Sequence, residues 1–229
     1  MWPTSGIAVS APVALGNTSA YYLNAGIGDF TGDGQSDLLF RNVNTNEVAT
    51  WGVSNNALTT APHVLGSAPR DVQIVAIDDF TGDHQADILF RFQNGDIAIW
   101  QVANNDLAGR PALVGSTSSA YHVVATGDFD GNGASDILFR NDNGDLAMWL
   151  LNSAGELLTT PAAIGTMGPQ YHVEGTGDLN GDGRSDIVFR DADGTLLEWL
   201  MNGTAHGAAV PFGHASVDYS IAAHHFDLV

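Results

Sequence analysis

The sequence predicts an all-β fold built from a tandem repeat, and three observations support this prediction. Tryptophans recur at spacings of 49, 49, 49 and 50 residues. An aspartate followed by Phe or Leu recurs in step with them, at Asp29, Asp79, Asp128 and Asp178. Each period holds four short apolar segments and no long segment of 3.6-residue periodicity. Four strands in a unit of roughly 40–50 residues are typical of a β-propeller, in which each unit forms one blade.

The first predicted strand of a unit is apolar and carries a tyrosine, namely Tyr22, Tyr121, Tyr171 or Tyr219. An acidic, glycine-rich loop follows, and then a second strand that reads "DLLFR", "DILFR" or "DIVFR". Turns such as 93–96 and 141–145 contain Asn-Gly, which favours a hairpin into a third strand that carries the tryptophan. The fourth predicted strand of each unit is the stretch that leads up to the next glycine after the tryptophan strand. The second and third strands are apolar on both faces, which predicts that they pack between neighbouring sheets.

The repeat predicts a single domain over residues 1–229, with units at about 20–66, 70–115, 120–165 and 170–214. The last copy is shorter, because Asp227 follows Asp186 by 41 residues where the other copies give 49 or 50. We therefore expect five four-stranded blades of about 49 residues. The fifth would combine residues 1–19, which give the third and fourth strands, with residues 215–229, which give the first and second. This closure removes free sheet edges. The alternative is closure between chains, which would make the protein an oligomer.

The composition excludes several classes of function. There are 26 acidic residues against seven arginines and no lysine, for a formal charge of −19, and there is no cysteine. Such a surface repels phosphate backbones and anionic lipids, so nucleic acid and membrane surfaces are not expected partners. Disulfides and thiol chemistry are excluded. No run of 18 apolar residues exists and no signal peptide is visible, so membrane insertion is not expected and the export route stays open.

The four acidic loops share a pattern of oxygen-bearing residues at loop positions 1, 3, 5 and 9, with glycine at position 4. The backbone carbonyl of position 7 would add a further oxygen. Hard oxygen ligands suit Ca²⁺, whereas the absence of Cys and His at these positions argues against zinc or copper. We expect about four structural Ca²⁺ ions. The predicted metal residues are Asp29, Thr31, Asp33, Gln35 and Asp37; Asp79, Thr81, Asp83, Gln85 and Asp87; Asp128, Asp130, Asn132, Ala134 and Asp136; and Asp178, Asn180, Asp182, Arg184 and Asp186.

The alternative is that these loops are simple Asn/Asp/Gly turns. Four copies in register, each with aspartate at positions 1 and 9, favour metal binding. The loops hold 12 of the 26 acidic residues, so four bound Ca²⁺ ions would change the formal charge from −19 to −11. The second loop has His84 where the others have glycine, which would strain a left-handed turn. It is expected to bind Ca²⁺ most weakly.

The pattern "GDFxGDGxxDILFR…W" resembles the FG-GAP/VCBS repeats of bacterial extracellular proteins, which are akin to the blades of integrin α-subunits. The resemblance covers nearly the whole chain. It implies a propeller with Ca²⁺ in the loop between the first and second strands, and it implies binding or adhesion more often than catalysis. Propeller lectins with related repeats also exist. The fifth copy departs from the pattern, so it is not expected to hold Ca²⁺.

Two further sets of repeated residues are candidate ligand-binding groups. The tryptophans could stack on sugar rings, and the alternative is packing between blades. The arginines could donate to sugar hydroxyls or acidic sugars, and the alternative is an ion pair with turn carboxylates such as Asp96 or Asp145. The sequence leaves both alternatives open. The residues are Trp51, Trp100, Trp149 and Trp199, and Arg41, Arg91, Arg140 and Arg190.

Catalysis is not expected, because the distinctive side chains recur in every unit and no single asymmetric site stands out. The leading hypothesis is a lectin or adhesin that binds glycans or glycoconjugates through repeated sites. The alternatives are a protein-interaction propeller with an extracellular protein partner, and an accessory domain of a larger secreted protein. Extracellular Ca²⁺ and the family resemblance predict a secreted or cell-surface location.

Overall fold

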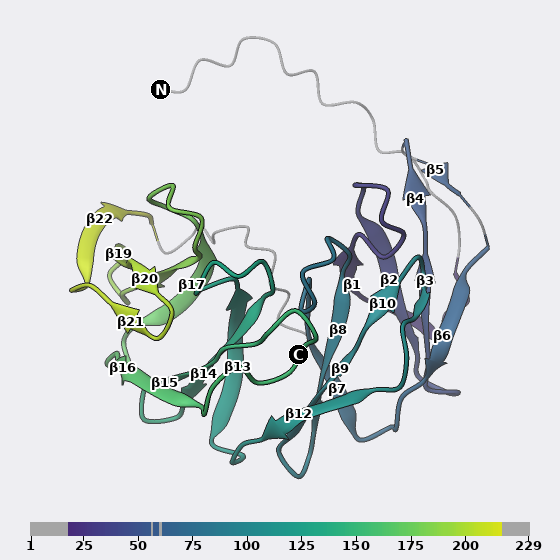
Figure 1. The fold of residues 1–229 in the computed structure, drawn as a ribbon, viewed down its shortest axis with the longest axis horizontal. Coiled ribbons are helices and arrows are strands. Elements are labelled where there is room, and N and C mark those ends of the chain that lie inside the picture. The colour runs from purple at the N-terminus through teal and green to yellow at the C-terminus, as the bar shows by residue number, and fades with distance from the viewer. Residues whose placement is uncertain (1–17, 56, 60, 217–229) are drawn as a thin grey trace.

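A computed structural model describes residues 18–55, 57–59 and 61–216. Over these residues the protein is all-β, with four four-stranded antiparallel sheets and three two-stranded ribbons. Figure 1 shows the four sheets following one another along an arc, from purple near the N-terminus to yellow near the C-terminus. The described residues form no helix long and apolar enough to cross a membrane. The predicted all-β, propeller-like arrangement of four-stranded units is therefore present.

The first two sheets have the strand orders β1-β2-β3-β6 and β12-β9-β8-β7, so each unit runs across its sheet in chain order. The ribbons β4-β5 and β10-β11 extend from the ends of β3 and β9. The bounds are β1 Tyr22–Gly28, β2 Asp37–Asn42, β3 Glu47–Trp51, β4 Val53–Ser54, β5 Ala57–Leu58, β6 His63–Ser67, β7 Val72–Asp78, β8 Asp87–Phe92, β9 Asp96–Trp100, β10 Val102–Ala103, β11 Asp106–Leu107 and β12 Ala112–Ser116.

The third and fourth sheets repeat this plan with the orders β13-β14-β15-β16 and β17-β18-β19-β22. A single bridge, Leu151 to Leu157, replaces the ribbon in the third unit, and β20-β21 forms it in the fourth. The bounds are β13 Tyr121–Gly127, β14 Asp136–Asn141, β15 Asp145–Trp149, β16 Ala162–Thr166, β17 His172–Gly177, β18 Asp186–Arg190, β19 Thr195–Trp199, β20 Met201–Asn202, β21 Ala205–His206 and β22 Val210–His214.

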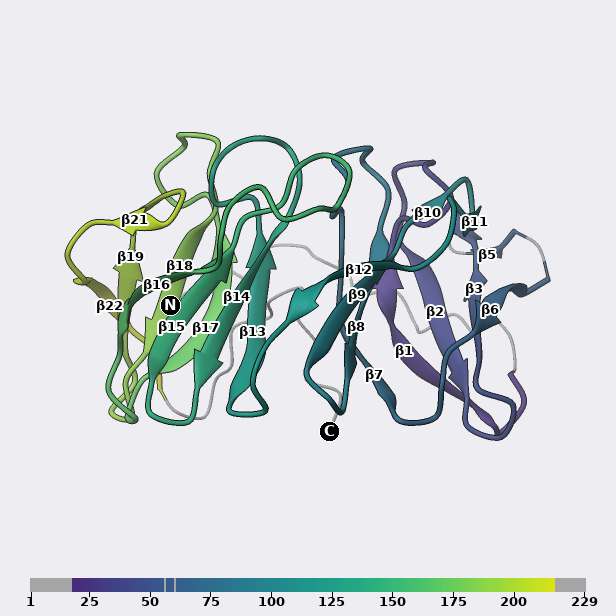
Figure 2. The ribbon, with the colours of Figure 1, turned by 60° about the horizontal axis from the view of Figure 1, so that its bottom comes forward.

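The first strands of the four sheets, β1, β7, β13 and β17, contact one another in order and form the inner wall of the arc. Each pairs with its second strand through the same register shift, for example between Val123 and Ala125 in β13. Figure 2 shows that the acidic loops and the two-stranded ribbons lie at one common end of the sheets. This arrangement gathers the predicted metal loops on one rim.

The core consists of side chains packed between successive sheets. The phenylalanines at loop position 2, Phe30, Phe80 and Phe129, are fully buried. In the second to fourth units the phenylalanine of the second strand packs on the tryptophan of the third, with ring centroids 4.8–5.0 Å apart. Apolar residues on both faces of these strands are therefore explained by a neighbouring sheet on each side.

The predicted fifth blade, formed by residues 1–19 and 215–229, falls almost wholly outside the described residues, as does Tyr219. The blade count of five and the closure of the ring therefore stay predictions. The four described sheets extend over residues 22–67, 72–116, 121–166 and 172–214.

Candidate functional site: the acidic loops

The aspartate at loop position 1 folds its carboxylate back onto its own loop. In the first loop, Asp29 accepts N–H bonds from Gly32 and Gly34, both at 2.7 Å. The same two bonds recur in the other three loops at 2.6–2.9 Å. They require positive φ at positions 4 and 6, which glycine adopts at little cost, as Gly32 (74°) and Gly34 (79°) do. The sequence pattern of Asp and Gly therefore specifies one loop conformation four times.

The second loop adopts this conformation with a non-glycine residue. His84 lies at φ 66°, where the other loops have Gly34, Gly133 and Gly183 at 79–90°. A side chain with a Cβ is disfavoured in this left-handed region by about 1 kcal/mol. The strained turn expected from the sequence is therefore present, and the His84 side chain points into solvent with 95% exposure.

The aspartate at loop position 9 is fully buried in every unit, at Asp37, Asp87, Asp136 and Asp186. One carboxylate oxygen accepts the N–H of position 2 at 2.9–3.1 Å. The other accepts the N–H of the second residue beyond the repeated tryptophan at 2.8 Å. This carboxylate therefore ties the start of the loop to the end of the third strand, a role that the sequence pattern did not reveal.

The side chain at loop position 5 accepts the N–H of position 7, as Asp33 does from Gln35 at 2.8 Å and Asn132 from Ala134 at 2.8 Å. The glutamines at position 7 of the first two loops bond both to the aspartate at position 5 of their own loop and to the following ribbon. Gln35 donates to Ser54 and Gln85 accepts from the N–H of Asn104. Among the predicted ligands, position 7 could therefore contribute only its backbone carbonyl, as the sequence analysis assumed.

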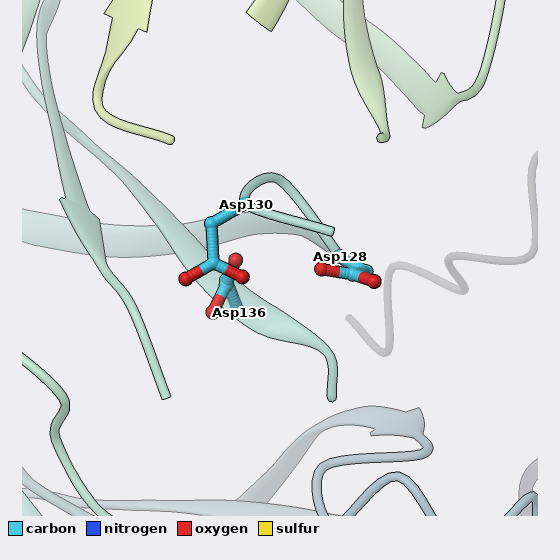
Figure 3. A group of neighbouring side chains, drawn as sticks. All are labelled: Asp128, Asp130 and Asp136. Atoms are coloured by element: carbon cyan, nitrogen blue, oxygen red, sulfur yellow. The ribbon is translucent and has the colours of Figure 1, made fainter. Parts of the chain in front are cut away.

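The third loop brings three carboxylates together. Asp128, Asp130 and Asp136 each place one oxygen within 4.8 Å of the other two. Figure 3 shows Asp130 and Asp136 side by side, with Asp128 across the loop. Three carboxylates converging from a nine-residue loop form a donor set suited to a hard divalent cation such as Ca²⁺. Among the described residues, this is the one group of three acidic or histidine side chains that meets this distance criterion.

Burial and neighbouring carboxylates disfavour the ionised form of the position-9 aspartate in the second and third loops. Burial raises the pKa of Asp87 to about 7 and that of Asp136 to about 8. The carboxylates at positions 1 and 5 of the second loop, and at positions 1 and 3 of the third, raise these pKa values further, whereas backbone N–H bonds from Val102 and Leu151 lower them. Carboxylates held in this way would be stabilised as anions by a divalent cation.

The other loops fill the same positions with different chemistry. In the second loop, Thr81 donates its hydroxyl to the carboxylate of Asp87 at 3.1 Å. In the fourth loop, Arg184 forms an ion pair with Asp182 at 2.8 Å, so a guanidinium already neutralises one predicted ligand. The four loops therefore share a backbone but differ in the donors that they offer.

Consecutive loops are joined directly through their backbones. The N–H at position 8 of the second, third and fourth loops donates to the carbonyl at position 1 of the preceding loop: Ala86 to Asp29 at 2.8 Å, Ser135 to Asp79 at 2.7 Å and Ser185 to Asp128 at 2.6 Å. The small residue that recurs at position 8 is the sequence signal for this contact. A row of loops linked in this way forms a continuous rim along the arc.

The repeated arginines also join neighbouring units. Arg41 donates to the carbonyls of Pro69 and Val72, and Arg91 to those of Ser118 and Tyr121. Arg140 and Arg190 make the corresponding contacts, Arg140 with carbonyls at 167, 168 and 171 and Arg190 with those at 215 and 216.

Burial lowers the pKa of Arg41, Arg91 and Arg140. The described residues show no ion pair from these arginines to Asp96 or Asp145. Arg190 forms an ion pair with Glu174 at 3.6 Å. The arginines therefore connect neighbouring blades, which is neither the sugar contact nor the ion pair with a turn carboxylate that the sequence suggested. Their role in ligand binding stays a prediction.

The repeated tryptophans lie between the sheets. Trp100, Trp149 and Trp199 are 7%, 4% and 4% exposed, and Trp51 is half-buried. The tryptophan rings pack on the phenylalanine of the neighbouring strand. In the fourth unit, Trp199 also stacks on the ring of His206, with the ring centroids 3.7 Å apart. Their placement favours the packing alternative over a stacking platform for sugars.

The fold and the loops define a class: an all-β, propeller-like repeat protein with an acidic loop after the first strand of each unit. A model of the FG-GAP-like repeat matches residues 29–90, 79–139 and 128–189, in three overlapping tandem copies. The chain therefore belongs to the FG-GAP-like repeat family. No curated protein matches the sequence.

The solved structures that are similar to the chain include Raptor and BBS1N. Raptor from Chaetomium thermophilum is 17% identical at a TM-score of 0.51, and the match covers 87% of this chain and 17% of that one. BBS1N, crystallised in complex with ARL6DN and soaked with lead, is 16% identical at a TM-score of 0.42, with 86% of this chain and 58% of that one covered. At this identity the likeness to Raptor supports the fold alone.

Proposed function

We propose that this chain is a Ca²⁺-stabilised propeller that binds a macromolecular partner and catalyses no reaction. The main support for calcium binding is that Asp128, Asp130 and Asp136 of the third loop place carboxylate oxygens within 4.8 Å of one another. Ca²⁺ takes oxygen ligands from carboxylates and carbonyls in flexible geometry, and the loop offers both. In the other loops, the acidic residues at positions 1, 5 and 9 would supply the carboxylates.

The role proposed for Ca²⁺ is structural. Without the ion, the carboxylates of a loop repel one another, and a ligand that binds only the folded state stabilises it by about 2.7 kcal/mol at a hundredfold excess over Kd. Scanning calorimetry in millimolar Ca²⁺ and in chelator tests this proposal. We expect a melting temperature lower by several degrees in chelator. Identical melting curves would contradict calcium binding.

We also propose that the ring closes with a fifth blade contributed by both ends of the chain. The support lies on the side of the fourth sheet that faces away from the third, where Leu179 and Phe212 are 46% and 49% exposed. Their counterparts in the third unit, Phe129 and Ile164, are 0% and 6% exposed because the next sheet covers them. Apolar side chains at core positions indicate that a further sheet belongs on this face.

Light scattering coupled to gel filtration tests this closure, with the full chain compared with a version ending at residue 216. A monomeric full chain, destabilised by the truncation, is the expected result. A dimer of the full chain would instead indicate closure between two copies.

The partner is proposed from the family and from the site. FG-GAP repeats are consistent with a propeller that mediates protein interactions. The glycan hypothesis depended on the repeated tryptophans and arginines, and these are packed between blades or engaged by carbonyls. We therefore favour an extracellular protein partner, with glycans as the second candidate.

A glycan array and a pull-down from an extracellular protein fraction, both in millimolar Ca²⁺, separate these two candidates. Capture that free sugars do not compete away supports a protein partner. Selective glycan binding by the array would instead support a lectin. A secreted or cell-surface location follows from the same proposal, since millimolar Ca²⁺ is found outside cells.

A further inference from the structure

A cavity of about 510 Å³ opens at the loop end of the inner wall, between the first strands of the four sheets. Its volume falls in the range of roughly 300–1,000 Å³ that is typical of small-molecule sites. Two of its sides differ. Ile27 and Ile77 give an aliphatic wall from the first two units, whereas Thr126 and Thr176 place hydroxyls at the corresponding strand positions of the third and fourth. The cavity is thus amphipathic, unlike the symmetric rim of loops around it.

One charged residue breaks the repeat inside this cavity. Asp78 ends β7 where the other first strands end in Gly28, Gly127 and Gly177. A Cβ placed on Gly28 would lie 2.5 Å from the Cβ of Ala86, so at least one of the other units leaves no room for a side chain here. The second unit nevertheless carries a carboxylate at this crowded position and directs it to the cavity.

The Asp78 carboxylate is held in place from the neighbouring strand. Its Oδ2 accepts the hydroxyl of Thr126 at 2.6 Å, and its Oδ1 accepts the N–H of Asp79 at 2.9 Å. Thr176 in turn donates to the carbonyl of Thr126 at 2.6 Å. Each oxygen of an ionised carboxylate accepts more than one hydrogen bond, so Asp78 keeps acceptor capacity that a ligand could use.

The other carboxylates that line the cavity already accept hydrogen bonds from their own loops. Asp29, Asp79 and Asp128 are the position-1 residues, whose oxygens accept the N–H groups of their own loops. His84 is the one basic residue among the described residues that line the cavity, and its side chain is 95% exposed. His84 lies 4.0 Å from Asp79, so the described ion pairs of the cavity leave Asp78 without a cationic side chain. A carboxylate with spare acceptor capacity beside aliphatic and hydroxyl walls matches an alkylammonium group in both charge and shape.

We propose that this cavity binds a protonated primary aliphatic amine, with Asp78 as its charged acceptor and Ile27 and Ile77 against its methylene groups. The amine could belong to a free small molecule or to a lysine side chain of a partner, because the two share the same ammonium and methylene chain. Within the described residues this site occurs once, whereas the loop conformation around the position-1 aspartate recurs in all four units. The overall charge of −19 further favours the approach of cations.

Calorimetric titration of the full chain with cadaverine and with Nα-acetyl-lysine methylamide, in saturating Ca²⁺, tests this proposal. Calcium occupies the loop carboxylates during the titration, so binding reports on Asp78. We expect saturable binding of at least one probe, and the tighter of the two identifies a free amine or a lysine side chain as the better match. The neutral analogue 1,5-pentanediol should bind at least tenfold more weakly than cadaverine.

Three variants make the test specific. Asp78→Asn keeps an oxygen that can accept the Thr126 hydroxyl but removes the charge, and it should weaken amine binding at least tenfold. Asp78→Gly installs the residue that the other three units carry and should abolish binding. Asp71→Asn removes one charge from an exposed residue just before the opposite end of β7 and should leave binding unchanged.

Several results would overturn the proposal. These are no binding of either probe to folded protein, binding by Asp78→Asn within twofold of the unsubstituted chain, equal binding of the diol, or amine binding that Ca²⁺ displaces. The last result would locate amines in the acidic loops. None of these results depends on the partner proposed above, whereas failure of the calcium proposal would appear as an unchanged melting curve in chelator.

Discussion

The second and third acidic loops have the same backbone path but differ in the side chains around it. In both, the position-1 aspartate binds the N–H groups of its loop and the position-9 aspartate is fully buried. The third loop adds Asp130 and turns at Gly133, whereas the second has Thr81 and the strained His84. The comparison separates two functions of the repeat: positions 1 and 9 build the loop, and positions 3 and 6 adjust what it can bind.

The two loops also balance charge differently. In the second loop the Thr81 hydroxyl donates to Asp87, which partly compensates the buried carboxylate without a metal. Both loops carry three carboxylates, but in the third loop Asp130 places one of them close to Asp136, at the position where the second loop has Thr81. A cation is therefore of greater benefit to the third loop, and four experiments can break or sharpen this contrast.

The largest expected effect comes from the buried aspartate of the third loop. Asp136→Ala leaves the N–H groups of Phe129 and Leu151 without their acceptor and removes a metal ligand, so we expect a loss of about 3–5 kcal/mol in urea unfolding. Asp136→Asn keeps one oxygen and should lose less. Equal stabilities of Asp136→Ala and the unsubstituted chain would show that this carboxylate does not hold the loop.

A pH series in chelator should show the cost of burying these carboxylates without a cation. The pKa values of Asp87 and Asp136 rise from 3.8 to about 7 and about 8 on folding, so the folded state retains protons that the unfolded state releases. Stability should therefore fall as the pH rises from about 4 to 8. The fall is at most about 1.4 kcal/mol per pH unit for each group.

Saturating Ca²⁺ should flatten this dependence, because the ion stabilises the anionic carboxylates. Chemical unfolding at pH 6 and pH 7, with and without the ion, measures the difference. A pH dependence that is the same in both conditions would argue against metal binding by these two loops.

Exchanging the position-3 residues should transfer calcium affinity between the loops. We expect Asp130→Thr to weaken the third site about tenfold, and Thr81→Asp to strengthen the second by a similar factor, because each changes the carboxylate count by one. Terbium luminescence or calorimetry on the single variants gives the site affinities. The interpretation fails if the second loop of the unsubstituted chain is among the tightest sites.

The smallest effect should come from the strained turn. His84→Gly relieves a left-handed φ of 66° and should stabilise the protein by up to about 1 kcal/mol, which for a chain of this size is roughly 2–4 °C in melting temperature. Gly133→His in the third loop is the matched reverse change and should be destabilising. A loss of stability in His84→Gly would indicate that the histidine makes a contact that outweighs the strain.

Much of the fold was predictable because the repeat encodes it locally. The spacing of the tryptophans and of the Asp-Phe pairs gave the four-stranded units, and the Asp/Gly pattern gave the loop conformation, including the strain at His84. The contacts between units were not predictable in this way. The carbonyl partners of Arg41 and Arg91, the second N–H bond of Asp136 and the packing of Trp149 all depend on how one sheet sits against the next.

The acidic loops were likewise predictable only in the features that their local sequence encodes. Residue types and spacing identified the acidic loops, but they could not show that Asp130 completes a cluster while Arg184 neutralises Asp182. Asp78 was not predicted as a site residue, because the cavity that it lines forms only where the inner strands of the four sheets lie together.

The arginine contacts have a consequence for how such a chain could grow. Arg41, Arg91 and Arg140 bind carbonyls 27–31 residues further along the chain, in the connection to the next unit or at the start of its first strand, and Arg190 binds carbonyls 25 and 26 residues further along. A duplicated segment of one repeat length would therefore carry both the guanidinium that fastens it to its successor and the carbonyls that receive its predecessor. New copies would be joined from the moment they arose, without any second substitution to adapt the junction.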